Sequence, residues 1–150
     1  MATTLKTASL VTKITEKLTL NGKDFGNTTT KTIAGIKDCS QRIIRVLSAA
    51  NGTQLYAGGA AVGPGTFISA NVQYIRVTNL DASNYVILHL EGSSHYAQLK
   101  LEAGKSFLLP TPVGFDNNAD MDSFSSETIT KIEALANTAN VDVEVFVASK

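Results

Sequence analysis

The chain of 150 residues has a single cysteine, no tryptophan and only three prolines. One cysteine can form neither an internal disulfide nor a thiolate zinc site, so we expect Cys39 to be a small buried apolar side chain. Basic and acidic residues balance at 13 each. The chain therefore lacks the basic excess with which proteins neutralise nucleic-acid phosphates, and nucleic acid is not an expected partner.

Long apolar runs are also missing. Residues Met1 to Lys6 lack the apolar centre of a secretory signal, and no later stretch approaches the roughly 18 apolar residues that a membrane-spanning helix needs. We expect a protein that is made in soluble form, without a signal peptide and without a membrane partner. A chain of this length suits one domain with one core.

Threonine, serine, valine, isoleucine, alanine and glycine are abundant, a composition that favours strands and turns. Short β-type runs recur, each closed by turn residues, and apolar residues show no helical spacing before about residue 127. The predicted strands are Leu10–Leu20, Thr30–Ile36, Gln41–Leu47, Thr53–Tyr56, Thr66–Ser69, Val72–Asn79, Tyr85–Leu90, Tyr96–Leu101 and Ser106–Leu109. Leu10, Ile14, Leu18 and Leu20 are expected on one buried face of the first strand.

The last segment has the clearest pattern, because valines at alternate positions through residues 141–147 place four side chains on one sheet face. Phe146 lies on the opposite face, where it either packs beneath a loop or belongs to an interface. The preceding segment, Ile129–Ala139, fits a short helix or a strand, and we favour the strand.

Turn signals connect these segments. Asn21-Gly22 can begin a tight reversal, because both residues tolerate positive φ. Residues 80–84 are predicted to join antiparallel neighbours, and residues 102–105 to close a hairpin. Successive strands without crossover helices predict an all-β fold, an antiparallel β-sandwich of jelly-roll type over residues 10–150, after a short N-terminal arm over residues 1–9.

The motifs that could indicate catalysis are few and incomplete. His89 and His95 are the only histidines, and no nucleophile signature accompanies them. The run from Ala103 to Ser106 ends like a phosphate-binding loop, but Leu99 stands where that motif needs its first glycine. We expect no enzyme activity, no catalytic residues and no cofactor-binding residues.

One acidic loop has the spacing of a metal site. The first, third, fifth, seventh and twelfth positions of an EF-hand calcium loop correspond to Asp116, Asn118, Asp120, Asp122 and Glu127. The sixth position, where the sharp turn needs glycine, is Met121, and no helix is legible upstream. Two interpretations stay open: a solvated acidic loop, and a calcium site that stiffens an assembly contact.

Several segments resemble those of small virion proteins of tailed bacteriophages. They are Leu18–Lys23, Gln41–Val46, Tyr74–Leu80, Lys100–Phe107 and the ending from Ile129 to Phe146. The resemblance spans most of the chain but consists of strand and turn patterns. It implies β-sandwich proteins that coat, cement or connect parts of the particle, with no catalytic residues to carry over.

Within that family, small size and the lack of heptads or fibrous repeats favour a capsid decoration or cement protein of the virion. We expect it to be made in the host cytoplasm, to form homo-oligomers, with a trimer as the first candidate, and to bind a major virion protein. A head–tail, tail or fibre-associated virion subunit is the alternative. A carbohydrate- or ligand-binding module is a second alternative, and it would need exposed tyrosines.

Overall fold

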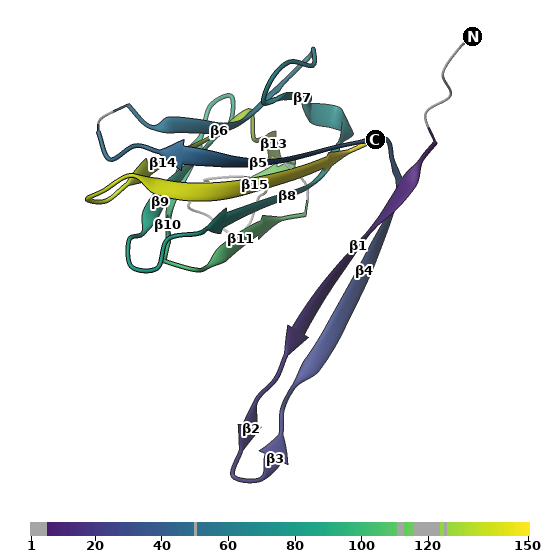
Figure 1. Ribbon diagram of the computed structural model, residues 1–150. Coiled ribbons are helices and arrows are strands. Elements are labelled where there is room, and N and C mark those ends of the chain that lie inside the picture. The colour runs from purple at the N-terminus through teal and green to yellow at the C-terminus, as the bar shows by residue number, and fades with distance from the viewer. Residues whose placement is uncertain (1–5, 50, 111–112, 116–123, 125) are drawn as a thin grey trace.

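Figure 1 shows the computed structural model of the protein, which describes residues 6–49, 51–110, 113–115, 124 and 126–150. The fold is all-β, as predicted. In these ranges the one helical segment is a single 3₁₀ turn, Ser69–Asn71. None of the helical structure described is long and apolar enough to cross a membrane.

Two sheets form the body of the molecule (Figure 1). The four-stranded sheet has the order β11 (Ser106–Leu109), β8 (Val72–Asn79), β15 (Val141–Ser149) and β5 (Asp38–Val46). The five-stranded sheet has the order β10 (Tyr96–Leu101), β9 (Val86–Glu91), β14 (Lys131–Ala136), β6 (Thr53–Gly59) and β7 (Thr66–Ile68). All pairs are antiparallel except β6 and β7. A separate short ladder joins β12 (Val113–Phe115) to β13 (Glu127–Thr128).

One hydrophobic core lies between these two sheets. The four alternate valines of β15 are buried in it, which confirms the predicted face. Ile75 and Val77 add to the core from the four-stranded side, and Leu88 and Ile132 from the five-stranded side. Burial of apolar side chains from both sheets is the main contribution to stability in such an arrangement.

A long hairpin projects from the body (Figure 1). Its strands β1 (Ala8–Glu16) and β4 (Asn27–Ile36) pair along their length, and β2 (Thr19–Leu20) pairs with β3 (Lys23–Asp24) at the tip. Asn21 and Gly22 have φ values of 51° and 78°, the positive pair that a type I′ turn requires. The reversal predicted at this dipeptide is confirmed. We call residues 6–37 the arm, a longer segment than the N-terminal arm predicted over residues 1–9, and residues 38–150 the body.

The arm changes one prediction about the first strand. The segment Leu10–Leu20 was expected to bury one face, but Ile14, Leu18 and Leu20 are exposed. The tight turn at Asn21-Gly22 pairs this segment with the next one along the chain. Both strands therefore leave the body together, and the two-sheet body begins at β5.

Two predicted neighbour relations are wrong. Strand β8 pairs with β11 and β15, whereas β9 lies in the other sheet, so residues 80–85 cross between sheets. Strands β10 and β11 are separated in the same way. The turn between them exists, since the Lys105 amide donates to the Glu102 carbonyl at 3.2 Å and Gly104 has φ +69°. It redirects the chain to the opposite sheet and does not close a hairpin.

Cys39 is exposed, contrary to the prediction that it is buried. It lies on β5, an edge strand of the four-stranded sheet, opposite Ala148. Valines of β15 mark the inner face of this sheet, and alternate residues of a strand point to opposite faces. Ala148 alternates with these valines and so points to the outer face, and Cys39, directly opposite it, points the same way. The thiol therefore lies outside the core between the sheets.

Candidate functional surfaces

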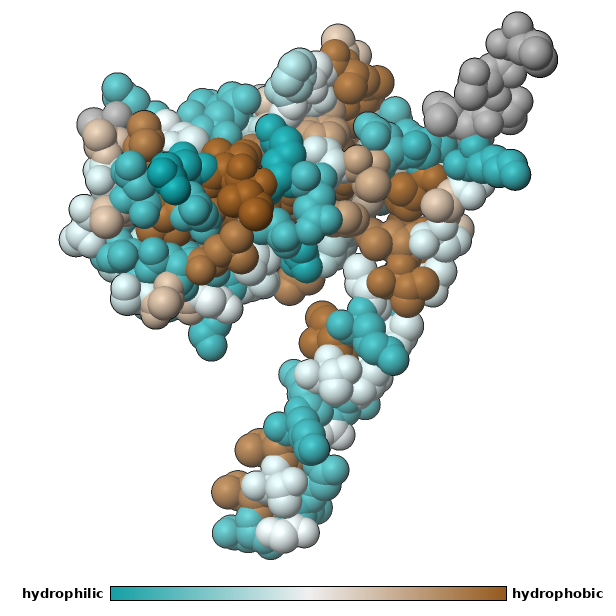
Figure 2. Space-filling model, in the orientation of Figure 1, coloured by the Kyte–Doolittle hydropathy of each residue, from teal (hydrophilic) through white to brown (hydrophobic). Residues whose placement is uncertain are grey.

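The arm carries an uncovered set of apolar side chains. Val11, Ile14, Leu18, Leu20 and Phe25 are each between 53% and 58% exposed. Figure 2 shows apolar side chains along the arm, interleaved with polar ones. A two-stranded ribbon has little core of its own and is marginal in water when it is isolated. These side chains therefore stay exposed unless another surface covers them.

Sequence patterns alone did not identify the arm. A signal was present in residues 27–32, which contain asparagine, threonine and lysine and no apolar residue. A strand with one face in a core alternates apolar and polar residues. A strand-forming segment that is polar on both faces, next to an Asn-Gly turn, indicates a hairpin that leaves the core.

The base of the arm is fixed to the body by a small apolar cluster. Ile36, Tyr74 and Ala148 are buried there, with Leu10, Ile33 and Phe146 packed against them. The rings of Tyr74 and Phe146 meet edge to face, with centroids 6.1 Å apart and planes at 66°. Phe146 therefore lies opposite the valines, as predicted, and its neighbours include the base of the arm. Whether it also meets another subunit stays a prediction.

A cleft of about 500 Å³ opens between the arm and the outer face of the four-stranded sheet. Leu10 and Ile14 line it from the arm, and Phe146 and Leu108 line it from the body. Arg76 also lines the cleft and forms an ion pair with Glu144. The cleft is thus mainly apolar, with a charge pair at its edge.

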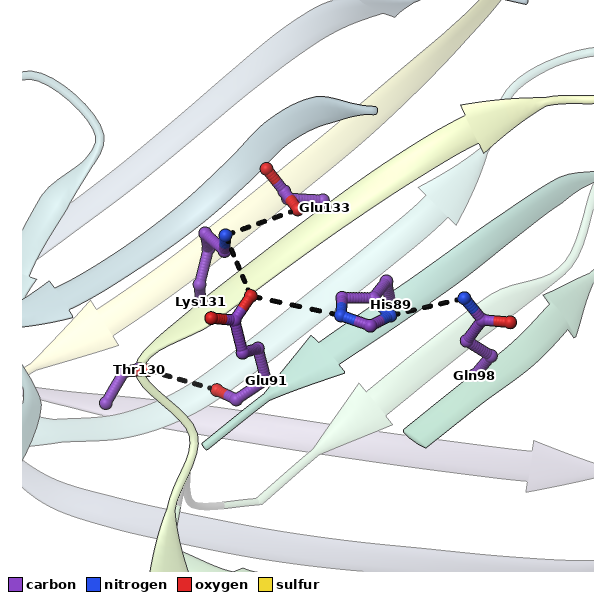
Figure 3. Close-up of polar contacts among 6 residues, drawn as sticks. All are labelled: His89, Glu91, Gln98, Thr130, Lys131 and Glu133. Atoms are coloured by element: carbon purple, nitrogen blue, oxygen red, sulfur yellow. Dashed lines mark hydrogen bonds and ion pairs between the residues drawn. The ribbon is translucent and has the colours of Figure 1, made fainter. Parts of the chain in front are cut away.

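A cluster of polar side chains lies on the outer face of the five-stranded sheet (Figure 3). Lys131 Nζ lies 2.7 Å from a Glu91 oxygen and 3.4 Å from a Glu133 oxygen. Hydrogen bonding to Glu91 raises the pKa of Lys131 above its ordinary value. His89 lies between Glu91, at 3.9 Å, and the side-chain nitrogen of Gln98, at 3.3 Å. These groups bind one another, and the resulting polar network connects the side chains of three neighbouring strands, β9, β10 and β14.

Glu127 is the one residue of the predicted calcium loop that the structure describes; Asp116, Asn118, Asp120 and Asp122 lie outside the described residues. Its carboxylate accepts hydrogen bonds from the Ser93 hydroxyl and the Ser94 amide, and its second oxygen lies 2.9 Å from His95 Nδ1. The bond from Ser93 is the largest cause that lowers the pKa of Glu127. In this structure the carboxylate orders the turn between β9 and β10.

We expect acid to act on the fold through Glu127. Because the folded state lowers its pKa below the ordinary 4.5, the ionised carboxylate stabilises the fold above pH 4.5, and this contribution is lost as the pH falls through the lower folded-state value. The Glu127→Gln variant should show a shallower fall in unfolding free energy below pH 4.5 than the wild type, measured by urea unfolding at a series of pH values. Glu16→Gln, on the exposed arm, is the matched control. Equal slopes in Glu127→Gln and the wild type would contradict this role.

No three metal-ligating side chains come together among the residues that the structure describes. Comparison with protein-family models, with curated proteins and with solved structures finds no match to this chain. The role of the protein is therefore inferred from its own surfaces.

Proposed function

We propose that this protein is a non-enzymatic structural subunit of a virus particle, in the role of a capsid decoration or cement protein. The observation that carries the proposal is the arm, a ribbon whose apolar side chains are left exposed by its own body. Covering exposed apolar side chains with a partner is favourable, by roughly 25 cal/mol for each Å² of apolar surface removed from water. A protein that works by contacts between subunits uses such a surface.

The strand order supports a jelly roll as the fold of the body. Eight strands in chain order are β5, β6, β8, β9, β10, β11, β14 and β15. Their antiparallel partners are nested, since the first pairs with the eighth, the second with the seventh, the third with the sixth and the fourth with the fifth. Alternate pairs lie in opposite sheets, as in an antiparallel ribbon rolled into two layers. Viral capsid and lectin domains use this architecture.

The ligand-binding alternative has weaker support. Of the four tyrosines, Tyr56 and Tyr74 are buried, Tyr85 is half-buried, and Tyr96 alone is well exposed, at 66%. Sugar sites need aromatic faces beside free hydrogen-bonding groups. The polar groups next to Tyr96 on the five-stranded sheet already bind one another, so the arm is the better candidate for the functional surface.

The proposal is tested on particles from the virus that encodes the chain. We expect purified particles to contain the protein in many copies, measured by quantitative mass spectrometry, and we expect gold-labelled antibodies against the chain to mark the capsid surface in electron micrographs. Labels confined to the neck, tail or fibres would replace the decoration role with the alternative virion roles. Absence of the chain from purified particles would contradict a virion role altogether.

A further inference from the structure

One face of the arm is covered at its base and exposed further out. In β1, Leu10 and Thr12 are half-buried, whereas Val11 is exposed. Because side chains alternate along a strand, Leu10 and Thr12 share the face that turns toward the body. Ile14 is the next residue on this face, yet it is 53% exposed. The cover that the body gives to this face therefore fades between Thr12 and Ile14.

The opposite wall of the cleft is exposed as well. Leu108, on β11, is 41% exposed and lines the same cleft as Ile14. Tyr74 and Phe146 also line the cleft, and both belong to the cluster that holds the base of the arm. Two exposed apolar side chains of one chain thus lie on the two sides of one cleft. Covering each with the other removes both from water, which is favourable.

A bulge at the base sets the direction of the arm. The pairing of β1 with β4 shifts register between Ala8 and Ser9, which leaves Gly35 as the extra residue on the facing strand. Gly35 has φ +79°, a conformation that favours glycine. A bulge of this kind bends a ribbon and increases its twist. Beyond it the arm is two strands wide, the form of sheet in which strand twist is largest. The angle between arm and body therefore depends on a few residues at the base.

The charged groups beside the cleft are compatible with a narrower cleft. Glu144 is bound by Arg76 and by the side-chain nitrogen of Gln41 at 2.7 Å, so these groups stay paired beneath an arm that moves closer. Lys13 also lines the cleft. It alternates with Ile14 along β1, and its long side chain can keep the ammonium group in water. Narrowing the cleft therefore covers apolar surface without burying an unpaired charge.

We infer that the arm closes on its own body within a single copy of the protein. Closing extends the contact that Leu10 makes with the base to the next residue on the same face, so that Ile14 lies against Leu108. Because both walls belong to one chain, they meet at the high effective concentration of a tethered pair. Resting on the proposed structural role, opening of the arm then exposes Ile14 to a neighbouring copy.

Distances between two spin labels test the closing. The labels are attached at the tip and on the body, through Thr19→Cys and Lys105→Cys in a chain that also carries Cys39→Ser; all three positions are exposed. Double electron–electron resonance should give two distances, a longer one for the open arm and a shorter one for the closed arm. An excess of unlabelled protein should leave the shorter distance unchanged. A single long distance, or a shorter one that disappears with unlabelled protein, would overturn the inference.

Exchanged charges identify the side chains that meet. Leu108→Asp and Ile14→Lys should each remove the shorter distance, because one wall of the closed cleft is then charged. In the double variant the shorter distance should return, since an ion pair replaces the apolar contact. Leu80→Asp, at a leucine that is 47% exposed outside the cleft, should keep both distances. A shorter distance that survives in both single variants, or fails to return in the double variant, would overturn the contact.

Control measurements separate closing from folding and from the proposed function. The three side chains that receive a charge are each at least 41% exposed, so the midpoints of thermal unfolding should stay within about 2 °C of the wild type. Closing concerns one copy in solution, whereas the virion role concerns purified particles. A chain that is absent from particles but closes its arm rejects the virion role alone. A chain that is present on particles but shows a single long distance rejects the closing alone.

Discussion

Replacing Asn79 with alanine is expected to lower the free energy of unfolding by about 2–4 kcal/mol. Asn79 is fully buried, at 0% exposure. Its side-chain nitrogen donates to the carbonyls of Asn84, at 2.9 Å, and Leu101, at 3.2 Å, and its side-chain oxygen accepts from the Asp81 amide at 2.9 Å. Alanine removes three hydrogen bonds and takes these partners from polar backbone groups in a site that is buried or partly buried, which costs more than the bonds themselves contribute.

The effect is measured by urea unfolding of Asn79→Ala at neutral pH. Asn140→Ala is the matched control, because Asn140 is exposed and its side-chain oxygen accepts a single bond from the Ser48 amide at 3.2 Å. The control should lose less than about 1 kcal/mol. Equal losses in the two variants would mean that water replaces the buried partners of Asn79.

The positions of the strands were predicted better than their partners. Strands β8 and β11 begin and end at the predicted residues, and the segment that fitted either helix or strand contains β14. Alternating burial leaves a period of two in the sequence, and that period identifies a strand. It carries no information about which strand lies alongside.

The connection over residues 80–84 shows why the local sequence pattern could not predict the strand partners. Its length and polarity suit a hairpin, yet Asn79 binds both this loop and Leu101 of the other sheet. These bonds tie the end of β8 to the opposite layer. A buried asparagine at the end of a strand looks like an ordinary turn residue in the sequence, so the crossing could not be read from local pattern.

The surface of the arm was partly predictable. The alternation through Leu10 and Ile14 correctly indicates a strand, and its apolar side chains need a cover. Whether the cover is the core of the same chain or a second molecule depends on where the turn at Asn21-Gly22 sends the chain. Phe146 had the same ambiguity, and the structure packs it against Tyr74, with the base of the arm nearby.

A second large loss of stability is expected for Ile132→Ala. Ile132 is 0% exposed in β14, where Leu90 and Tyr56 lie opposite it on the flanking strands. Deleting this much of a buried side chain removes apolar contact and leaves a cavity, at a cost of about 2–5 kcal/mol. For a chain of this size the midpoint of thermal unfolding should fall by roughly 5–15 °C, measured by differential scanning calorimetry.

The same substitution at Ile14 separates stability from assembly. Ile14 is 53% exposed on the arm, and Ile14→Ala should cost less than about 1 kcal/mol in dilute solution, where no second copy covers the arm. At concentrations at which the expected homo-oligomer forms, this variant should dissociate more readily than the wild type, because we expect the exposed side chains of the arm to be covered by the neighbouring copy. Ile132→Ala should instead unfold at lower temperature whatever the protein concentration. If Ile14→Ala were as destabilising as Ile132→Ala in the monomer, the arm would have to be part of the body's cooperative unit, and its apolar residues would stabilise the fold of a single copy.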